Sequence, residues 1–354
     1  MSDFCYLRIA GEREREGNLA EAMKAMVEAA RTVDDSAYVR IVTANAKRIL
    51  AKAAHRSARL LAGSMPTPIH TFNDTPDNYG RFAKGMQGRL PPLIALTTIS
   101  RRVSRVASTI DSILAQTVRA HSINLYVSAE PYLVDEGIAP DDKVLCEIAN
   151  MGVNIYLTTN IGPYRKQIPI VLQLRRGNAP SATPIITIDD DVIYPTNIIG
   201  DLLDALERSS AIVAHRGRKI TVRNARLARY DTFDEPTPKA SLSNLGTGKN
   251  GIAYRLSHFP RNAEDFVGPV LAPTADDLWC KWVTGTYCVP TFVLEPRAAY
   301  DSAFDFKESA PTDKTGLFHS YNARGMNDTA IDNLEAYFSG RRKSLASLIA
   351  GSAK

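Results

Sequence analysis

The stretch Thr183–Pro195, TPIITIDDDVIYP, carries the most informative pattern in the sequence. The apolar and β-branched residues Ile185–Ile188 are typical of a buried strand, and they run directly into Asp189, Asp190 and Asp191. Along an extended strand, Asp189 and Asp191 would project to one side and Asp190 to the other. Three adjacent carboxylates repel one another, and Mg²⁺ or Mn²⁺ would neutralise them because both ions bind hard oxygen ligands. A solvated acidic turn ahead of a helix is the alternative interpretation.

Strand-like and helix-like segments alternate around this stretch, from Pro92 onward. The pattern predicts strands at residues 93–99, 122–129, 153–159 and 184–191. It predicts helices at residues 105–117, 141–152 and 166–177, the first with Ile110, Ile113 and Leu114 on one face. Such alternation is typical of an open α/β sheet, mostly parallel, with right-handed crossovers and helices on its faces.

Polar residues follow the predicted strands. Ligands of open α/β sheets bind beyond the carboxyl ends of the strands. We therefore expect one rim to gather the polar residues Thr97, Thr98, Ser128, Thr158, Asp189, Asp190 and Asp191.

The chain divides into three regions that differ in composition and in the spacing of apolar residues. Residues 12–61 are Ala-rich with apolar residues at helical spacing, and residues 63–92 are rich in Pro and Gly. Residues 1–90 are therefore predicted to form a helical N-terminal extension and linker. Residues 91–334 form the predicted α/β catalytic domain, and residues 335–354 a C-terminal helical tail.

Composition limits the class of protein. The 354 residues are 44% hydrophobic and 23% charged, which is ordinary for a soluble globular chain. Nothing resembles a secretory signal or a segment of roughly 20 apolar residues that would span a bilayer. The four cysteines lack zinc-type spacing and predict reduced thiols in the cytoplasm.

The net charge of +5 is concentrated between Arg40 and Arg89, where basic residues outnumber acidic ones. This pattern is typical of a solvated face, or of a surface that meets anionic lipid or phosphate. We expect a cytoplasmic protein whose only membrane contact is peripheral, at the inner face, through the basic N-terminal helices. We expect no nucleic-acid partner.

A second acidic motif lies in the segment PTADDLW, where Asp276 and Asp277 open a predicted helix. Thr274 as N-cap and the helix dipole would account for both acids. Alternatively, one of them is a general base, whose pKa burial would raise. Trp279 and Trp282 beside them predict either core packing, the commoner position, or stacking on a sugar.

Basic and glycine residues offer further ligand contacts. Arg101, Arg102 and Lys166 are candidates for phosphate binding, or members of exposed cationic loops. Gly248 and Gly251 permit close backbone approach to a ligand or supply a tight turn.

These motifs together resemble the GT-A glycosyltransferases. DDDVIYP is similar to their D-x-D motif for metal and nucleotide-sugar. Five further segments agree in order, and the resemblance covers about residues 91–334: PLIALTTISRRVSRVASTIDSILAQT, NIGPYRKQIPIVLQL, LGTGKNGIAYR, LAPTADDLWCKW and GLFHSYNARGMNDTAI.

The resemblance implies a metal-dependent enzyme that moves a sugar from a nucleotide-sugar, UDP-linked by default, to a glycan or lipid-linked acceptor in cell-envelope polysaccharide synthesis. It implies Mn²⁺ or Mg²⁺ at Asp191, with Asp189 and His319 as further ligands; a structural or surface role is the alternative for His319. Asp277 would be the general base of an inverting reaction, supported by Asp276. The implied donor contacts are Thr97, Thr98, Arg102, Lys166, Asp189 and Asp190.

Two other classes fit part of the pattern. Phosphohydrolases of the haloacid dehalogenase type also carry D-x-D after an apolar strand, but there the motif opens the domain. A non-catalytic scaffold that binds nucleotide or glycan on a GT-A fold is the second alternative.

Overall fold

The computed structural model describes residues 69–71, 79–224, 226–294, 307–308, 317–322 and 325–352. Nearly all of the predicted N-terminal extension lies outside these residues.

An eight-stranded sheet with the order β1-β4-β3-β2-β5-β12-β7-β13 forms the centre of the molecule. Its strands are β1 (Ile69–Thr71), β2 (Leu93–Thr97), β3 (Ser122–Val127), β4 (Asn154–Leu157), β5 (Pro184–Thr187), β7 (Ile212–Ala214), β12 (Ile252–Arg255) and β13 (Thr291–Val293). Neighbouring strands are parallel except at β12, which is antiparallel to both β5 and β7. The predicted α/β class with a mostly parallel central sheet is therefore confirmed.

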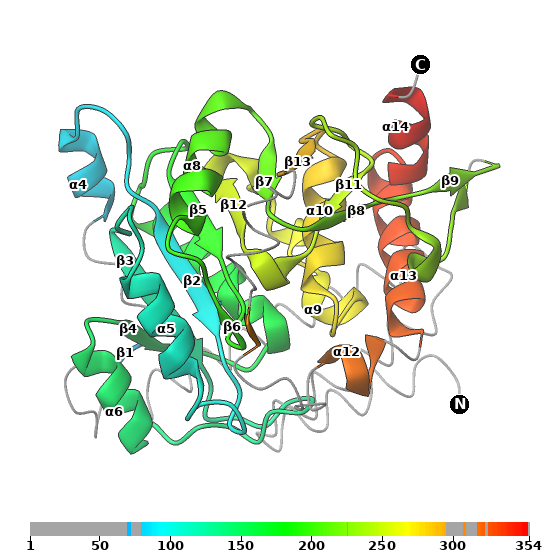
Figure 1. Ribbon diagram of the computed structural model, residues 1–354. Coiled ribbons are helices and arrows are strands. Elements are labelled where there is room, and N and C mark those ends of the chain that lie inside the picture. The colour runs from blue at the N-terminus through cyan, green and yellow to red at the C-terminus, as the bar shows by residue number, and fades with distance from the viewer. Residues whose placement is uncertain are drawn as a thin grey trace.

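Helices flank the sheet, with α5 and α6 on one side of the molecule and α13 and α14 on the opposite side (Figure 1). The helices are α4 (Tyr79–Gly85), α5 (Val106–Leu114), α6 (Lys143–Asn150), α7 (Ile168–Arg176), α8 (Ile198–Arg208), α9 (Gly268–Leu271), α10 (Asp276–Gly285), α12 (Leu317–Ser320), α13 (Met326–Arg341) and α14 (Leu345–Ser352). The three helices predicted within residues 105–177 are confirmed as α5, α6 and α7. Helix α13 continues across residue 334, where the helical tail was predicted to begin.

Short elements complete the fold. They are the 3₁₀ turns η1 (Gly162–Lys166) and η3 (Gly248–Asn250) and three two-stranded pairs: β8 (Gly217–Lys219) with β11 (Asn244–Gly246), β9 (Val222–Arg223) with β10 (Arg226–Leu227), and β6 (Val192–Ile193) with β14 (Lys307–Glu308).

Both faces of the sheet are buried, so its strands are apolar on both sides. In β2, Leu93 and Ala95 face the core cluster that contains α10, whereas Ile94 and Leu96 face the cluster that contains α5 and α8. Leu114 was expected on the buried face of α5 but is 46% exposed, because it is the last residue of the helix.

Helix α10 is almost wholly buried, and both of its tryptophans pack in the core. Trp279 and Trp282 have no exposed surface. The Trp279 Nε1 group donates to the Asp265 carbonyl at 2.9 Å, and that of Trp282 donates to Glu335 Oε2 at 2.8 Å. The packing interpretation of these residues is therefore confirmed.

Lys281 on α10 is buried, and no carboxylate forms an ion pair with it among the described residues. It is 3% exposed, and its Nζ has no hydrogen-bond partner in the part of the chain that the structure describes. Burial lowers the pKa of Lys281 to about 7. The unfolded chain, in which the lysine keeps its ordinary pKa, then binds the proton more tightly. The folded state therefore loses stability as pH falls from about 10 toward 7.

Replacement of this buried amine by an apolar side chain of similar length is expected to stabilise the fold. Lys281→Met should raise the free energy of unfolding by about 2–4 kcal/mol at pH 7, and by less at pH 9.5, in urea titrations. Lys343→Met, at an exposed lysine, is the matched control and should show no such gain. An equal gain at both pH values would contradict the explanation.

Candidate active site

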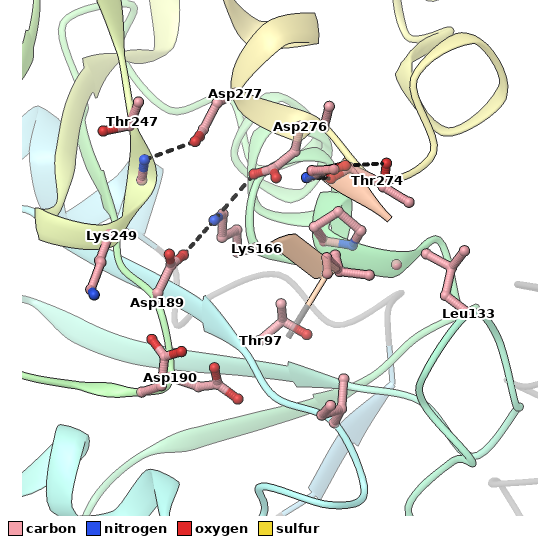
Figure 2. Close-up of a pocket in the computed structure, with 18 of the residues that line it drawn as sticks. Thr97, Leu133, Lys166, Asp189, Asp190, Thr247, Lys249, Thr274, Asp276 and Asp277 are labelled. Atoms are coloured by element: carbon pink, nitrogen blue, oxygen red, sulfur yellow. Dashed lines mark hydrogen bonds and ion pairs between the residues drawn. The ribbon is translucent and has the colours of Figure 1, made fainter. Parts of the chain in front are cut away.

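A cavity of about 570 Å³ lies at the carboxyl ends of β2 and β5. The residues after β5, the end of η1, the β8–β11 pair and the start of α10 also line it (Figure 2). It brings together Thr97, Thr98 and the three aspartates of the predicted rim. Ser128 and Thr158 are buried and lie outside its lining.

The three adjacent aspartates have different surroundings. Asp190 is buried, and both its carboxylate oxygens are bonded: Thr98 Oγ1 donates to Oδ2 at 2.6 Å, and Arg102 Nη1 lies 2.9 Å from Oδ1. The same Arg102 nitrogen is 3.1 Å from Asp191 Oδ2. The side chains of Asp189 and Asp191 are 30% and 35% exposed, so these two carboxylates open onto the cavity.

Thr97 and Arg101 differ from the other predicted ligand contacts. Thr97 lines the cavity, but its hydroxyl donates to the Tyr126 carbonyl at 2.7 Å. Arg101 lies outside the lining and forms an exposed ion pair with Glu136 at 2.6 Å.

Lys166 joins the two acidic motifs. Its Nζ lies 2.6 Å from Asp189 Oδ1 and 3.1 Å from Asp276 Oδ2, so one ammonium group bridges the end of β5 and the start of α10 (Figure 2). Burial opposes the charge on Lys166, but Asp189, Asp276 and Asp277 together hold its pKa well above the usual value. Lys166 therefore stays charged at physiological pH.

Asp277 is the carboxylate best placed to accept a proton. Its Oδ2 accepts a hydrogen bond from the Gly248 backbone amide at 2.9 Å, whereas Oδ1 has no hydrogen-bond partner in the described part of the chain. Burial, followed by the negative charge of Asp276, raises the pKa of Asp277 to about 7. A carboxylate with this pKa can accept a proton near neutral pH.

Gly248 lets these groups approach one another. A Cβ atom at this position would lie 3.0 Å from Lys166 Nζ, 3.2 Å from Asp277 Oδ1 and 3.4 Å from Asp189 Oδ1. The close-approach interpretation of Gly248 therefore fits. Gly251 follows with φ +89°, which serves the turn into β12.

The start of α10 differs from the prediction. Ala275, not Thr274, is the N-cap, and no side chain caps the helix. The Thr274 hydroxyl donates instead to Asn322 Oδ1 at 2.7 Å. The predicted Thr274 cap is therefore wrong, whereas Asp276 and Asp277 do lie in the first turn of α10, where the helix dipole stabilises them.

A divalent cation can bind here only through carboxylate oxygens that are not already bonded to other side chains. No group of three or more His, Cys, Asp or Glu side chains gathers to hold a metal among the described residues, and the side chain of His319 lies outside them. Asp189 and Asp191 each keep one carboxylate oxygen without a bonding partner in the described part. Burial and the charges of Asp189 and Asp190 raise the pKa of Asp191 to about 6. Two hard oxygens in an excess of negative charge fit Mg²⁺ or Mn²⁺ that takes its other ligands from phosphate and water.

A buried ion pair beside the cavity was missed in the sequence. Arg165 Nη2 lies 2.9 Å from Asp135 Oδ2 and donates to the Thr98 carbonyl at 3.0 Å, and Asp135 accepts from the Ser100 amide at 2.9 Å. This pair fixes the loop after β2. No local pattern connects residues 30 positions apart, so only the tertiary fold identifies it.

Tyr194 is a second missed residue. Its hydroxyl accepts from the Asp189 amide at 3.0 Å and donates to the Lys249 carbonyl at 2.9 Å. It thereby ties the aspartate loop to the η3 turn. Its place after the D-x-D motif was noted only as part of a resemblance.

Comparisons with known proteins give likenesses in fold. A scan of protein-family models found no match, and a search of curated proteins found none. Among solved structures, the chain is similar to 4-diphosphocytidyl-2C-methyl-D-erythritol synthase, with a TM-score of 0.38 and 9% identity over 59% of this chain and 91% of that one. It is also similar to S. aureus TarS 1-349 in complex with UDP, with a TM-score of 0.37 and 12% identity over 75% of this chain and 91% of that one. The complex of TarS 1-349 with UDP-GlcNAc gives a TM-score of 0.34 and 14% identity over 71% and 73%. At these identities the likeness concerns the fold alone.

Proposed function

We propose that this protein is a metal-dependent glycosyltransferase that moves a sugar from a nucleotide-sugar, UDP-linked as first choice, to a hydroxyl of a glycan or lipid-linked acceptor in envelope polysaccharide synthesis. One observation carries the proposal. Two acidic groups, Asp189–Asp191 and Asp276–Asp277, face the same cavity and are bridged by Lys166. The first group suits a cation and a diphosphate, and the second suits a general base.

The donor side of the cavity is formed by the ends of β2 and β5. Thr97, Thr98, Arg102 and Asp190 line it and are the proposed contacts for the nucleotide. Asp189 and Asp191 would hold Mn²⁺ or Mg²⁺, with His319 as a further candidate. When bound, the cation neutralises negative charge on the departing diphosphate.

The base side is formed by the start of α10 and the Gly248 turn. Asp277 Oδ1 takes the proton of the acceptor hydroxyl as that oxygen attacks the anomeric carbon. The bond between this carbon and the diphosphate oxygen breaks on the opposite face, so the configuration inverts. Asp276, held by Lys166 at 3.1 Å, supports the acceptor side.

The proposed location is the cytoplasm. No helix in the described part of the chain has the length and apolarity to cross a bilayer. A peripheral contact of the basic region between Arg40 and Arg89 with the inner membrane face belongs to the same proposal, on the charge of that region. Co-sedimentation of the protein with anionic liposomes tests it.

Nucleotide binding by Asp191→Ala tests the donor site. We expect the wild type to bind one of UDP, GDP and CMP at least tenfold more tightly with Mn²⁺ than without, in calorimetric titrations. Asp191→Ala should lose this gain, because it removes a proposed metal ligand. Asp141→Ala, at an exposed aspartate outside the cavity, is the control.

Failure of the wild type to bind any of these nucleotides would contradict the proposal. Release of phosphate from a generic phosphomonoester would then favour the phosphohydrolase. Nucleotide binding without sugar transfer or donor hydrolysis would favour the scaffold.

A further inference from the structure

Two arginines lie on the base side of the cavity. Arg216 and Arg218 flank Gly217 at the start of β8, and both line the cavity. Arg216 directly precedes the strand and Arg218 lies within it. Burial raises the pKa of Tyr230, and the charges of both arginines act on this residue and lower its pKa. Because all three residues line the cavity, the two guanidinium groups share the wall that contains Tyr230.

The pairing of β8 with β11 places this wall beside Asp277. Gly217 pairs with Gly246, and the Thr247 amide donates to the Arg216 carbonyl at 2.9 Å. The next amide, of Gly248, donates to Asp277 Oδ2 at 2.9 Å. Two consecutive backbone amides, those of Thr247 and Gly248, therefore bond to Arg216 and to the proposed base Asp277. Figure 2 shows Thr247 on the same side of the cavity as Asp277.

Among the described residues, these arginines lack the acidic partners that three other cations of the cavity have. Arg102 pairs with Asp190, Arg165 with Asp135 and Lys166 with Asp189. Arg218 lies over the Tyr230 ring, 5.3 Å from its centroid, and donates to the Tyr230 carbonyl at 3.3 Å. Neither Arg216 nor Arg218 has a carboxylate within ion-pair distance among the described residues.

The wall also contains an unused hydroxyl. Thr247 Oγ1 is buried and has no hydrogen-bond partner in the described part of the chain. Two guanidinium groups on one wall, with a hydroxyl on the same wall, suit an anion that accepts several hydrogen bonds, and a phosphate does so best.

We propose that the acceptor is a phosphate-bearing polyol or sugar, whose phosphate is bound by Arg216 and Arg218 while its hydroxyl lies at Asp277. This inference rests on the proposed function and deepens it, since it assigns the chemical class of the acceptor. The donor diphosphate has its own cations at the other wall, Arg102 and Lys166, close to Asp189–Asp191.

Direct binding of small probes tests the assignment without turnover. Glycerol 3-phosphate and the phosphodiester glycerophosphoglycerol are titrated against the wild type and the double variant Arg216→Ala/Arg218→Ala, with glycerol as the neutral probe. Ligand-observed NMR measures the affinities, and calorimetry measures UDP binding to the same samples. Arg216→Lys/Arg218→Lys keeps the charge, and Arg226→Ala removes an exposed arginine outside the cavity as the matched control.

The expected result is binding of both phosphate probes by the wild type and not of glycerol. The double alanine variant should weaken probe binding at least tenfold, the lysine variant should weaken it less, and UDP binding should stay unchanged.

Other outcomes overturn the assignment. If the double alanine variant weakened UDP binding as much as probe binding, the two arginines would belong to the donor site, and the proposed function would stand. Equal affinity for glycerol and glycerol 3-phosphate would exclude a phosphate site. Arginine-dependent binding of phosphatidylglycerol vesicles without binding of the soluble probes would assign the wall to a lipid headgroup. Arginine-dependent probe binding by a protein that binds no nucleotide would keep the phosphate site and reject the proposed function.

Discussion

Asp277→Asn is expected to lower the rate of sugar transfer by roughly 10²–10⁴-fold while nucleotide binding stays unchanged. Asparagine keeps the size of the side chain and an acceptor for the Gly248 amide, but it cannot take a proton from a hydroxyl. The comparison of steady-state rates with calorimetric affinities separates loss of chemistry from loss of binding. Asp141→Asn, outside the cavity, is the control and should keep the wild-type rate.

The pH profile gives an independent readout of the same residue. Burial and Asp276 raise the pKa of Asp277 to about 7, so the base is protonated below that pH. The wild-type rate should therefore fall about tenfold per pH unit below pH 7 and level off above it. The residual rate of Asp277→Asn should lack this inflection. A variant with the wild-type rate, or a product with retained configuration, would contradict the role as base.

Lys166→Met is expected to destabilise the fold by about 3–5 kcal/mol at pH 8, because it leaves Asp189 and Asp276 as unpaired charges around the cavity. The pKa of Lys166 is raised in the folded state. Its contribution to the free energy of unfolding is therefore complete below the ordinary pKa of lysine, and it is lost only as pH rises through the pKa of the folded state. Lys166 therefore keeps its charge at both pH 5 and pH 8.

The pH dependence of this loss identifies its cause. At pH 5 the unpaired carboxylates of the variant can bind protons, so the loss measured by urea unfolding should be smaller than at pH 8. Removal of the cation should also shift the inflection of the pH–rate profile above 7, since Lys166 lowers the pKa of Asp277. Lys166→Arg retains the charge and should lose less. An equal loss of stability at both pH values would show that unpaired carboxylate charge is not the cause.

Local patterns were enough to predict the central strands and the helices between them. β2, β3, β4 and β5 are short apolar runs bounded by turns, and α5 to α7 have helical spacing, so each could be recognised without its neighbours. The position of Asp189–Asp191 beyond a strand end also followed from local pattern. The error at Leu114 arose where a helix ends, which spacing alone does not define.

Long-range pairing could not be predicted in the same way. The segment Ile252–Arg255 was not among the predicted strands, yet it forms β12 between β5 and β7. The bridge from Lys166 to Asp276 joins residues 110 positions apart, and only the β8–β11 pairing brings Arg216 beside the Gly248 turn that contacts Asp277. Such contacts depend on how the sheet is ordered, which no single segment encodes.

The two walls of the cavity come from different stretches of the chain. The wall with Arg102, Lys166 and Asp189–Asp191 precedes α8, and the wall with Arg216, Arg218 and Asp277 follows it. On the proposed function, donor choice and acceptor choice are thus encoded in consecutive blocks of the gene. Recombination within the segment for α8 would exchange one specificity and retain the other, provided that both parents share the contacts between the two blocks, such as Lys166 with Asp276 and Tyr194 with Lys249.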